Sequence, residues 1–110
     1  MATLSGKLAV SQAQDQLIIK IIWFSSGDIA AQLSGFTNLD WRSSVAHVAI
    51  DIDYDGSNFE ARLLDSPGEA TDFVQGVYSV QKDQAGACIA VKITDILGES
   101  VVLTHEMDNQ

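Results

Sequence analysis

Short apolar runs, separated by polar or glycine-containing turns, follow one another along the chain. The clearest run alternates over residues 48–54 (Val-Ala-Ile-Asp-Ile-Asp-Tyr), and a second alternating run covers residues 88–94. Alternation with a period of two is typical of a strand with one buried face. Because several short strands follow at this spacing without a repeat or a linker, the pattern predicts an all-β fold.

A β-hairpin is predicted around Asp55-Gly56, which lies between the apolar runs 48–54 and 57–63. Asp-Gly is a strong signal for a two-residue turn, because both turn positions require φ > 0. A tip at these two residues places apolar side chains opposite each other on one face. The predicted register pairs Ile52 with Phe59, Ile50 with Ala61 and Val48 with Leu63.

A second hairpin is predicted near the end of the chain. Residues 95–99 (Asp-Ile-Leu-Gly-Glu) fit a three-residue loop in which Gly98 takes the left-handed position. The predicted register pairs Ile93 with Val101 and Val91 with Leu103.

Three further strands and one helix complete the prediction. The strands cover about residues 7–10, 17–24 and 73–80, and the β-branched density of 17–24 predicts burial on both faces. A short helix is expected within residues 25–35. The fold class predicted for residues 1–110, taken as a single domain, is therefore an immunoglobulin-like β-sandwich with one short helix. The alternative is a small α+β domain.

The charge of the chain argues against nucleic acids as partners. The chain of 110 residues has 15 acidic and 6 basic side chains, which gives a net charge of −9. Such a surface repels the phosphates of nucleic acids, so no direct binding of DNA or RNA is expected. The longest apolar run is too short to cross a membrane, so the chain is expected to have neither an export signal nor a membrane anchor. With its lone cysteine, Cys88, the chain is expected to be cytoplasmic.

An acidic segment on the first predicted hairpin is the candidate metal site. Asp51, Asp53 and Asp55 begin a pattern found in calcium loops, but Arg62 stands at the twelfth position, where those loops have glutamate. In the predicted hairpin, Asp51 lies opposite Glu60. The favoured interpretation is a solvated acidic face without a cofactor. The alternative is a calcium ion held by Asp51, Asp53, Asp55 and Glu60.

The sequence offers no recognisable catalytic motif. His47 and His105 are not accompanied by a nucleophile motif, and Cys88 begins an apolar strand, where an inert thiol is the default. Glycine-rich loops that bind phosphate are absent from the sequence. The chain is therefore predicted not to be an enzyme.

Two segments carry a resemblance to a known family. Residues 41–59 (from Trp41 to Phe59) and residues 89–98, with Tyr78 between them, resemble the C-terminal β-rich accessory region of bacterial site-specific adenine DNA methyltransferases. The chain lacks the catalytic Pro-Pro-Tyr motif and the cofactor loop of these enzymes. The resemblance therefore implies an accessory module, associated with a restriction-modification system, without methyl-transfer activity.

These observations predict a non-catalytic domain that binds a protein partner or forms a homo-oligomer. Binding is expected to use a sheet face or an exposed strand edge. The alternative is an extracellular immunoglobulin-like adhesion module that is stabilised by calcium.

Overall fold

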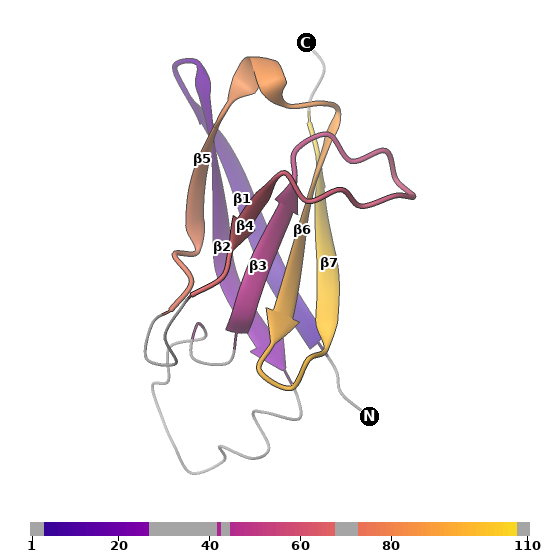
Figure 1. Cartoon of the computed structure of the whole chain (residues 1–110). Helices are drawn as coiled ribbons and strands as arrows, with labels where there is room; N and C mark the ends of the chain where they lie inside the picture. Colours follow the sequence, from indigo (N-terminus) through magenta and orange to yellow (C-terminus); the bar gives the residue numbers. More distant parts are fainter. Residues whose placement is uncertain (1–3, 27–41, 43–44, 68–72, 108–110) are drawn as a thin grey trace.

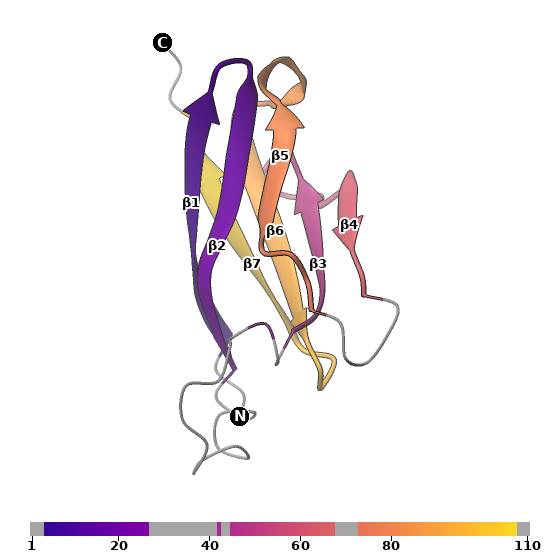
Figure 2. The ribbon, with the colours of Figure 1, turned by 90° about the vertical axis from the view of Figure 1, so that its left-hand side faces the viewer.

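Two antiparallel sheets lie face to face in the computed structural model of the chain (Figures 1 and 2), which describes residues 4–26, 42, 45–67 and 73–107. The three-stranded sheet has the order β1-β2-β5, and the four-stranded sheet has the order β4-β3-β6-β7. The strands are β1 (Leu4–Ala13), β2 (Gln16–Ser26), β3 (Val45–Asp51), β4 (Leu63–Asp65), β5 (Val77–Gln81), β6 (Cys88–Asp95) and β7 (Ser100–Glu106). The all-β, sandwich-like prediction is confirmed.

The hydrophobic core fills the space between the two sheets. The three-stranded sheet contributes Leu17, Ile19 and Tyr78, and the four-stranded sheet contributes residues such as Ile50 and Ile93. These side chains are buried because alternate residues of each strand point inward. The core is thus made by residues distant in sequence.

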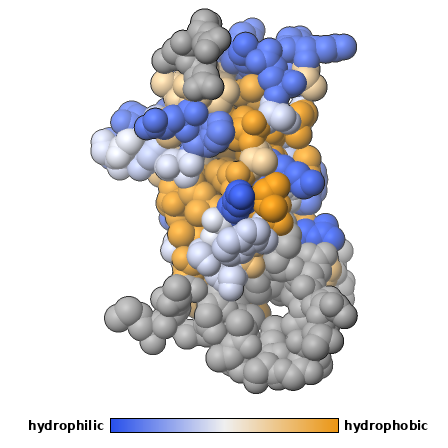
Figure 3. Space-filling view, turned by 180° about the vertical axis from the view of Figure 1, so that it is seen from behind, coloured by the Kyte–Doolittle hydropathy of each residue, from blue (hydrophilic) through white to orange (hydrophobic). Residues whose placement is uncertain are grey.

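The sequence predicted that residues 17–24 are buried on both faces, and this prediction is wrong for β2. Ile22 is an extra residue in the ladder with β1, because Leu8 pairs with Ile21 while Lys7 pairs with Trp23. This bulge leaves Ile22 40% exposed and Trp23 41% exposed. The apolar run 17–24, which only Lys20 interrupts, therefore reflects a bulge and an outer face that carries apolar residues. Seen from behind, on the side where β1 and β7 lie next to each other, apolar residues gather along the middle of the molecule (Figure 3).

The predicted hairpin of β6 and β7 is confirmed in its register and its loop. Ile93 pairs with Val101 and Val91 with Leu103, and Gly98 has a φ of 89°. The buried carboxylate of Asp95 accepts hydrogen bonds from the N–H groups of Leu97 and Glu99, at 3.0 and 2.9 Å. Asp95 therefore stabilises the loop from within.

The predicted Asp55-Gly56 hairpin is wrong in its register. β3 ends at Asp51, and Ile50 pairs with Leu63 in β4, so residues 52–62 form a loop between the two strands. Gly56 has a φ of 93°, but Asp55 does not adopt the positive φ that a two-residue turn would require. The carboxylate of Asp55 instead accepts hydrogen bonds from the N–H groups of Ser57 and Asn58, both at 2.8 Å.

Replacing Gly56 with valine is expected to lower the free energy of unfolding by about 1–3 kcal/mol, because a β-branched residue is strained at positive φ. A Cβ atom at this position would meet no atom within 4 Å, so backbone strain is the expected cause. Chemical denaturation measures the loss, and Ala61→Val in the same exposed loop is the control. An equal midpoint for the two variants would contradict this assignment.

Other predicted elements differ in extent or lie outside the described residues. The predicted strand 73–80 is shorter, because β5 begins at Val77, whereas β1 and β2 are longer than predicted and join in a tight turn where Gln14 has a φ of 58°. Apart from Ser25 and Ser26, which end β2, the expected helix falls outside the described residues. Within the described part of the chain, no helix is long and apolar enough to span a membrane.

Candidate functional site

The predicted acidic site is built differently from the solvated face that the sequence suggested. Asp51 is only 1% exposed, and its two carboxylate oxygens accept hydrogen bonds from the N–H groups of Asp53 and Glu60, at 3.0 and 2.9 Å. The Nε atom of Arg62 lies 3.5 Å from Asp51 Oδ1. Asp51 therefore holds both ends of the 52–62 loop and does not face Glu60 across a ladder.

The other three carboxylates of the predicted site, those of Asp53, Asp55 and Glu60, each make different contacts. Hydrogen bonds from the backbone of Asn58 and Ser57 lower the pKa of the exposed Asp55. Asp53 is exposed beside Gly86, and the Glu60 carboxylate lies 3.4 Å from Arg62. Among the described residues, no group of three or more His, Cys, Asp or Glu side chains is arranged to hold a metal ion.

Millimolar calcium is accordingly expected to leave the melting temperature of the domain nearly unchanged, because exposed carboxylates bind cations weakly. Calcium bound at a hundredfold excess over its Kd would instead add about 2.7 kcal/mol to the free energy of unfolding. Thermal unfolding with calcium, and with magnesium as the control, separates these outcomes. A calcium-specific rise of several degrees, abolished by Asp53→Asn together with Glu60→Gln, would support the calcium site.

The residues considered for catalysis lie on three different strands of the four-stranded sheet. His47 on β3 pairs with Thr94, and His105 on β7 pairs with Ile89. Cys88 at the start of β6 is partly exposed, and its sulfur lies 3.8 Å from the carbonyl oxygen of Ile89. No catalytic arrangement of these side chains is evident in the structure.

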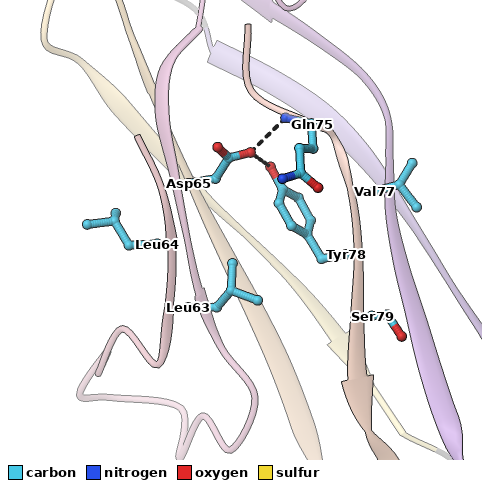
Figure 4. A pocket seen from close by; sticks show the side chains of 7 residues that line it. All are labelled: Leu63, Leu64, Asp65, Gln75, Val77, Tyr78 and Ser79. Atoms are coloured by element: carbon cyan, nitrogen blue, oxygen red, sulfur yellow. Dashed lines mark hydrogen bonds between the residues drawn. The ribbon is translucent and has the colours of Figure 1, made fainter. Parts of the chain in front are cut away.

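A hollow of about 450 Å³ lies where the β4 edge of one sheet approaches the β5 edge of the other (Figure 4). Of the two leucines of β4, Leu63 points toward Tyr78, whereas Leu64, which is 64% exposed, points away from it (Figure 4). On β5, Val77 is 46% exposed and its side chain points to the outer face. The lining residues are Leu63, Leu64, Asp65, Gln75, Val77, Tyr78 and Ser79.

A hydrogen-bonded link joins the two sheets at this hollow. The Tyr78 hydroxyl on β5 donates to Asp65 Oδ2 on β4 at 2.6 Å and accepts a bond from the N–H of Gly76 at 3.2 Å. Asp65 Oδ2 also accepts a bond from the N–H of Gln75 at 2.7 Å. Burial, followed by the hydrogen bond to Asp65, raises the pKa of Tyr78. The link keeps β4 and β5 at a fixed separation.

This link predicts a pH dependence of stability. The pKa of Tyr78 is raised in the folded state. The protonated hydroxyl therefore contributes its full stabilisation below the unfolded pKa of about 10, and this stabilisation is lost as the pH rises above about 10. Above pH ~10, the wild type should therefore lose stability faster than Tyr78→Phe. Urea midpoints of both proteins across this range measure the difference, and parallel profiles would contradict the prediction.

A second hollow continues the first along β5. Its volume is about 330 Å³, and it shares Leu63 and Ser79 with the first hollow. Its other lining residues are Ile52, Arg62, Val80, Gln81 and Gln84. The two hollows together form a groove, here called the β4–β5 groove, which runs beside β5 from Gln75 to Gln84.

The hydrogen bonds at the two ends of β5 show which of its residues direct their backbone groups toward β2. In an antiparallel pair, only every second residue exchanges hydrogen bonds with its partner. The N–H of Ile21 donates to the carbonyl of Gly76 at 2.8 Å, and the N–H of Lys82 donates to the carbonyl of Asp15 at 2.9 Å. The even-numbered residues of β5 therefore bond to β2.

The odd-numbered residues of β5 consequently present their backbone groups at the edge of the sheet. These residues are Val77, Ser79 and Gln81, and β5 is an outer strand with which no other described strand pairs on that side. The β5 sequence, Val-Tyr-Ser-Val-Gln, contains no charged residue and no proline. It thus lacks the residues with which natural proteins commonly block an exposed edge.

On the opposite side of the sandwich, β1 and β7 pack against each other. Gly6 on β1 lies so close to β7 that an added Cβ would be 2.9 Å from Leu103 Cδ1 and 3.1 Å from the carbonyl oxygen of Trp23. Side chains of β1 and β7 thus fill that side. The candidate binding site is therefore the β4–β5 groove with the free edge of β5.

The sequence predicted binding at a sheet face or an exposed strand edge, without indicating which strand. The Asp65–Tyr78 link joins residues 13 positions apart that belong to different sheets. The uncharged run 77–81 in a strongly acidic chain was the available signal for an open edge. No known protein family, curated protein sequence or solved structure matches the chain.

Proposed function

We propose that this chain is a non-catalytic protein-interaction domain that binds an extended segment of another protein as an additional strand along β5. The observation that carries the proposal is the free, uncharged edge of β5 beside an apolar groove. An extended segment placed there would pair its backbone with Val77, Ser79 and Gln81. Main-chain hydrogen bonds would provide affinity, and the groove would select side chains.

The strand order supports an immunoglobulin-like topology within this proposal. The orders β1-β2-β5 and β4-β3-β6-β7 correspond to strands A-B-E and C′-C-F-G of such sandwiches. In this scheme the groove lies between strands E and C′. A binding site on strand edges suits a fold in which both sheets leave outer strands unpaired.

The polar groups of the groove favour binding over chemistry. Asp65 and Tyr78 are hydrogen-bonded to each other, and the raised pKa of Tyr78 opposes its action as a base at neutral pH. Arg62 lies beside Asp51 and Glu60. We therefore propose no catalytic role for these residues. A cytoplasmic partner from a restriction-modification system remains a prediction that rests on the family resemblance.

A library of extended peptides displayed on phage and selected on the whole chain tests this proposal. Bound peptides should lose affinity for Ser79→Pro, which removes an outward N–H without breaking the ladder to β2, and should keep it for Ser79→Ala. Thr104→Pro is the matched control on β7, because the Thr104 N–H also points away from its neighbouring strand. Peptides that bind Ser79→Pro as well as they bind the wild type would overturn the proposal.

A further inference from the structure

The two ends of the β4–β5 groove differ in their charge. At one end, Asp65 Oδ2 accepts bonds from Tyr78 and Gln75, while within the described residues Asp65 Oδ1 accepts no hydrogen bond (Figure 4). This oxygen is a free acceptor on a partly exposed carboxylate at the rim of the groove. A cationic side chain passing this point would gain a charge-assisted hydrogen bond.

The other end of the groove carries a positive charge that is already compensated. The guanidinium of Arg62 lies 3.5 Å from Asp51 and 3.4 Å from Glu60. Arg62 therefore contributes little net attraction for an anionic ligand. The whole chain has a net charge of −9, which steers cationic partners toward it.

The middle of the groove selects apolar side chains. A strand added to β5 would point every second side chain toward the space lined by Leu63 and Val80, and the others toward the outer face beside Val77. Apolar side chains on the inward positions would cover Leu63, and they would leave no polar group unpaired there. An alternating sequence therefore fits this groove.

We propose that the bound segment has aliphatic residues at alternate positions and a lysine or arginine where it passes Asp65. This inference rests on the proposed strand addition at β5 and identifies its ligand as a cationic, extended segment of a partner protein. A second copy of this chain fits less well, because β5 has no basic residue and two chains of net charge −9 repel each other.

The test uses two synthetic ten-residue peptides in which valine and threonine alternate, with lysine at both ends of one peptide and glutamate at both ends of the other. The lysine peptide should bind the wild type at least about tenfold more tightly at low ionic strength. Asp65→Asn should remove most of that advantage, and Ser79→Pro should abolish binding of the lysine peptide. Amide chemical shifts of Val77, Ser79 and Gln81 report where the peptide binds.

The possible results separate this inference from the proposed function. Equal affinity for both peptides, lost in Ser79→Pro, would overturn the cationic ligand and retain strand addition. Binding that is insensitive to Ser79→Pro, or no binding by either peptide at millimolar concentration, would overturn both. A dimer of the free chain that dissociates in Ser79→Pro, measured by sedimentation, would overturn the partner segment in favour of a second copy.

Discussion

Replacing Asp51 with alanine is expected to lower the free energy of unfolding by about 2–4 kcal/mol, because several groups lose a buried hydrogen-bond acceptor together. The N–H groups of Asp53 and Glu60 both donate to this carboxylate, and the Nε of Arg62 lies 3.5 Å from it. Alanine leaves these donors without their partner and frees both ends of the 52–62 loop. Asp51→Asn retains one carbonyl acceptor and should lose less.

Urea denaturation of Asp51→Ala beside Asp55→Ala tests this expectation. Asp55 also accepts two backbone hydrogen bonds, but it is exposed, so water replaces its contacts and the loss should be much smaller. Equal losses in the two variants would show that burial of Asp51 does not govern the stability of the loop.

The Ile93→Ala variant should lose about 2–5 kcal/mol of unfolding free energy, because truncation leaves a cavity in a packed core. Ile93 is fully buried in β6, the strand that pairs with both β3 and β7. Neighbouring strands constrain the backbone on both sides, so the cavity cannot readily collapse.

Val102→Ala on the paired strand β7 is the matched control, because Val102 is an exposed apolar residue that faces away from the core. Its loss should stay within about 0.5 kcal/mol. The free energies come from denaturation curves with equal slopes. A loss for Val102→Ala as large as that for Ile93→Ala would contradict the assignment of the core face.

The two hairpins show which parts of this fold are predictable from sequence. The β6–β7 loop forms where alternation on both sides and the left-handed Gly98 agree on one register. Asp55-Gly56 carried an equally local signal, but Asp51 binds the backbone of Glu60 nine residues away and fixes a longer loop. A buried side-chain contact between distant residues thus overrode the turn preference.

The candidate site was less predictable than the fold, because it depends on how the two sheets are stacked. The sequence shows that Leu63 and Val80 are apolar, but it does not place them on the walls of one groove. Likewise, because of the bulge at Ile22, the sequence of β2 resembles that of a strand buried on both faces. Such features arise from inter-sheet geometry and from a single extra residue in a ladder.

The contact between β1 and β7 couples two positions that lie near opposite ends of the sequence. Gly6 and the Leu103 side chain share one small volume, since a Cβ on the first would lie 2.9 Å from the Cδ1 of the second. A larger residue at position 6 therefore requires the Leu103 side chain to shift or to become smaller, and its Cβ would also lie 3.1 Å from the carbonyl oxygen of Trp23. During sequence divergence, substitutions at positions 6 and 103 are therefore expected to occur together, because the size of each residue limits the size of the other.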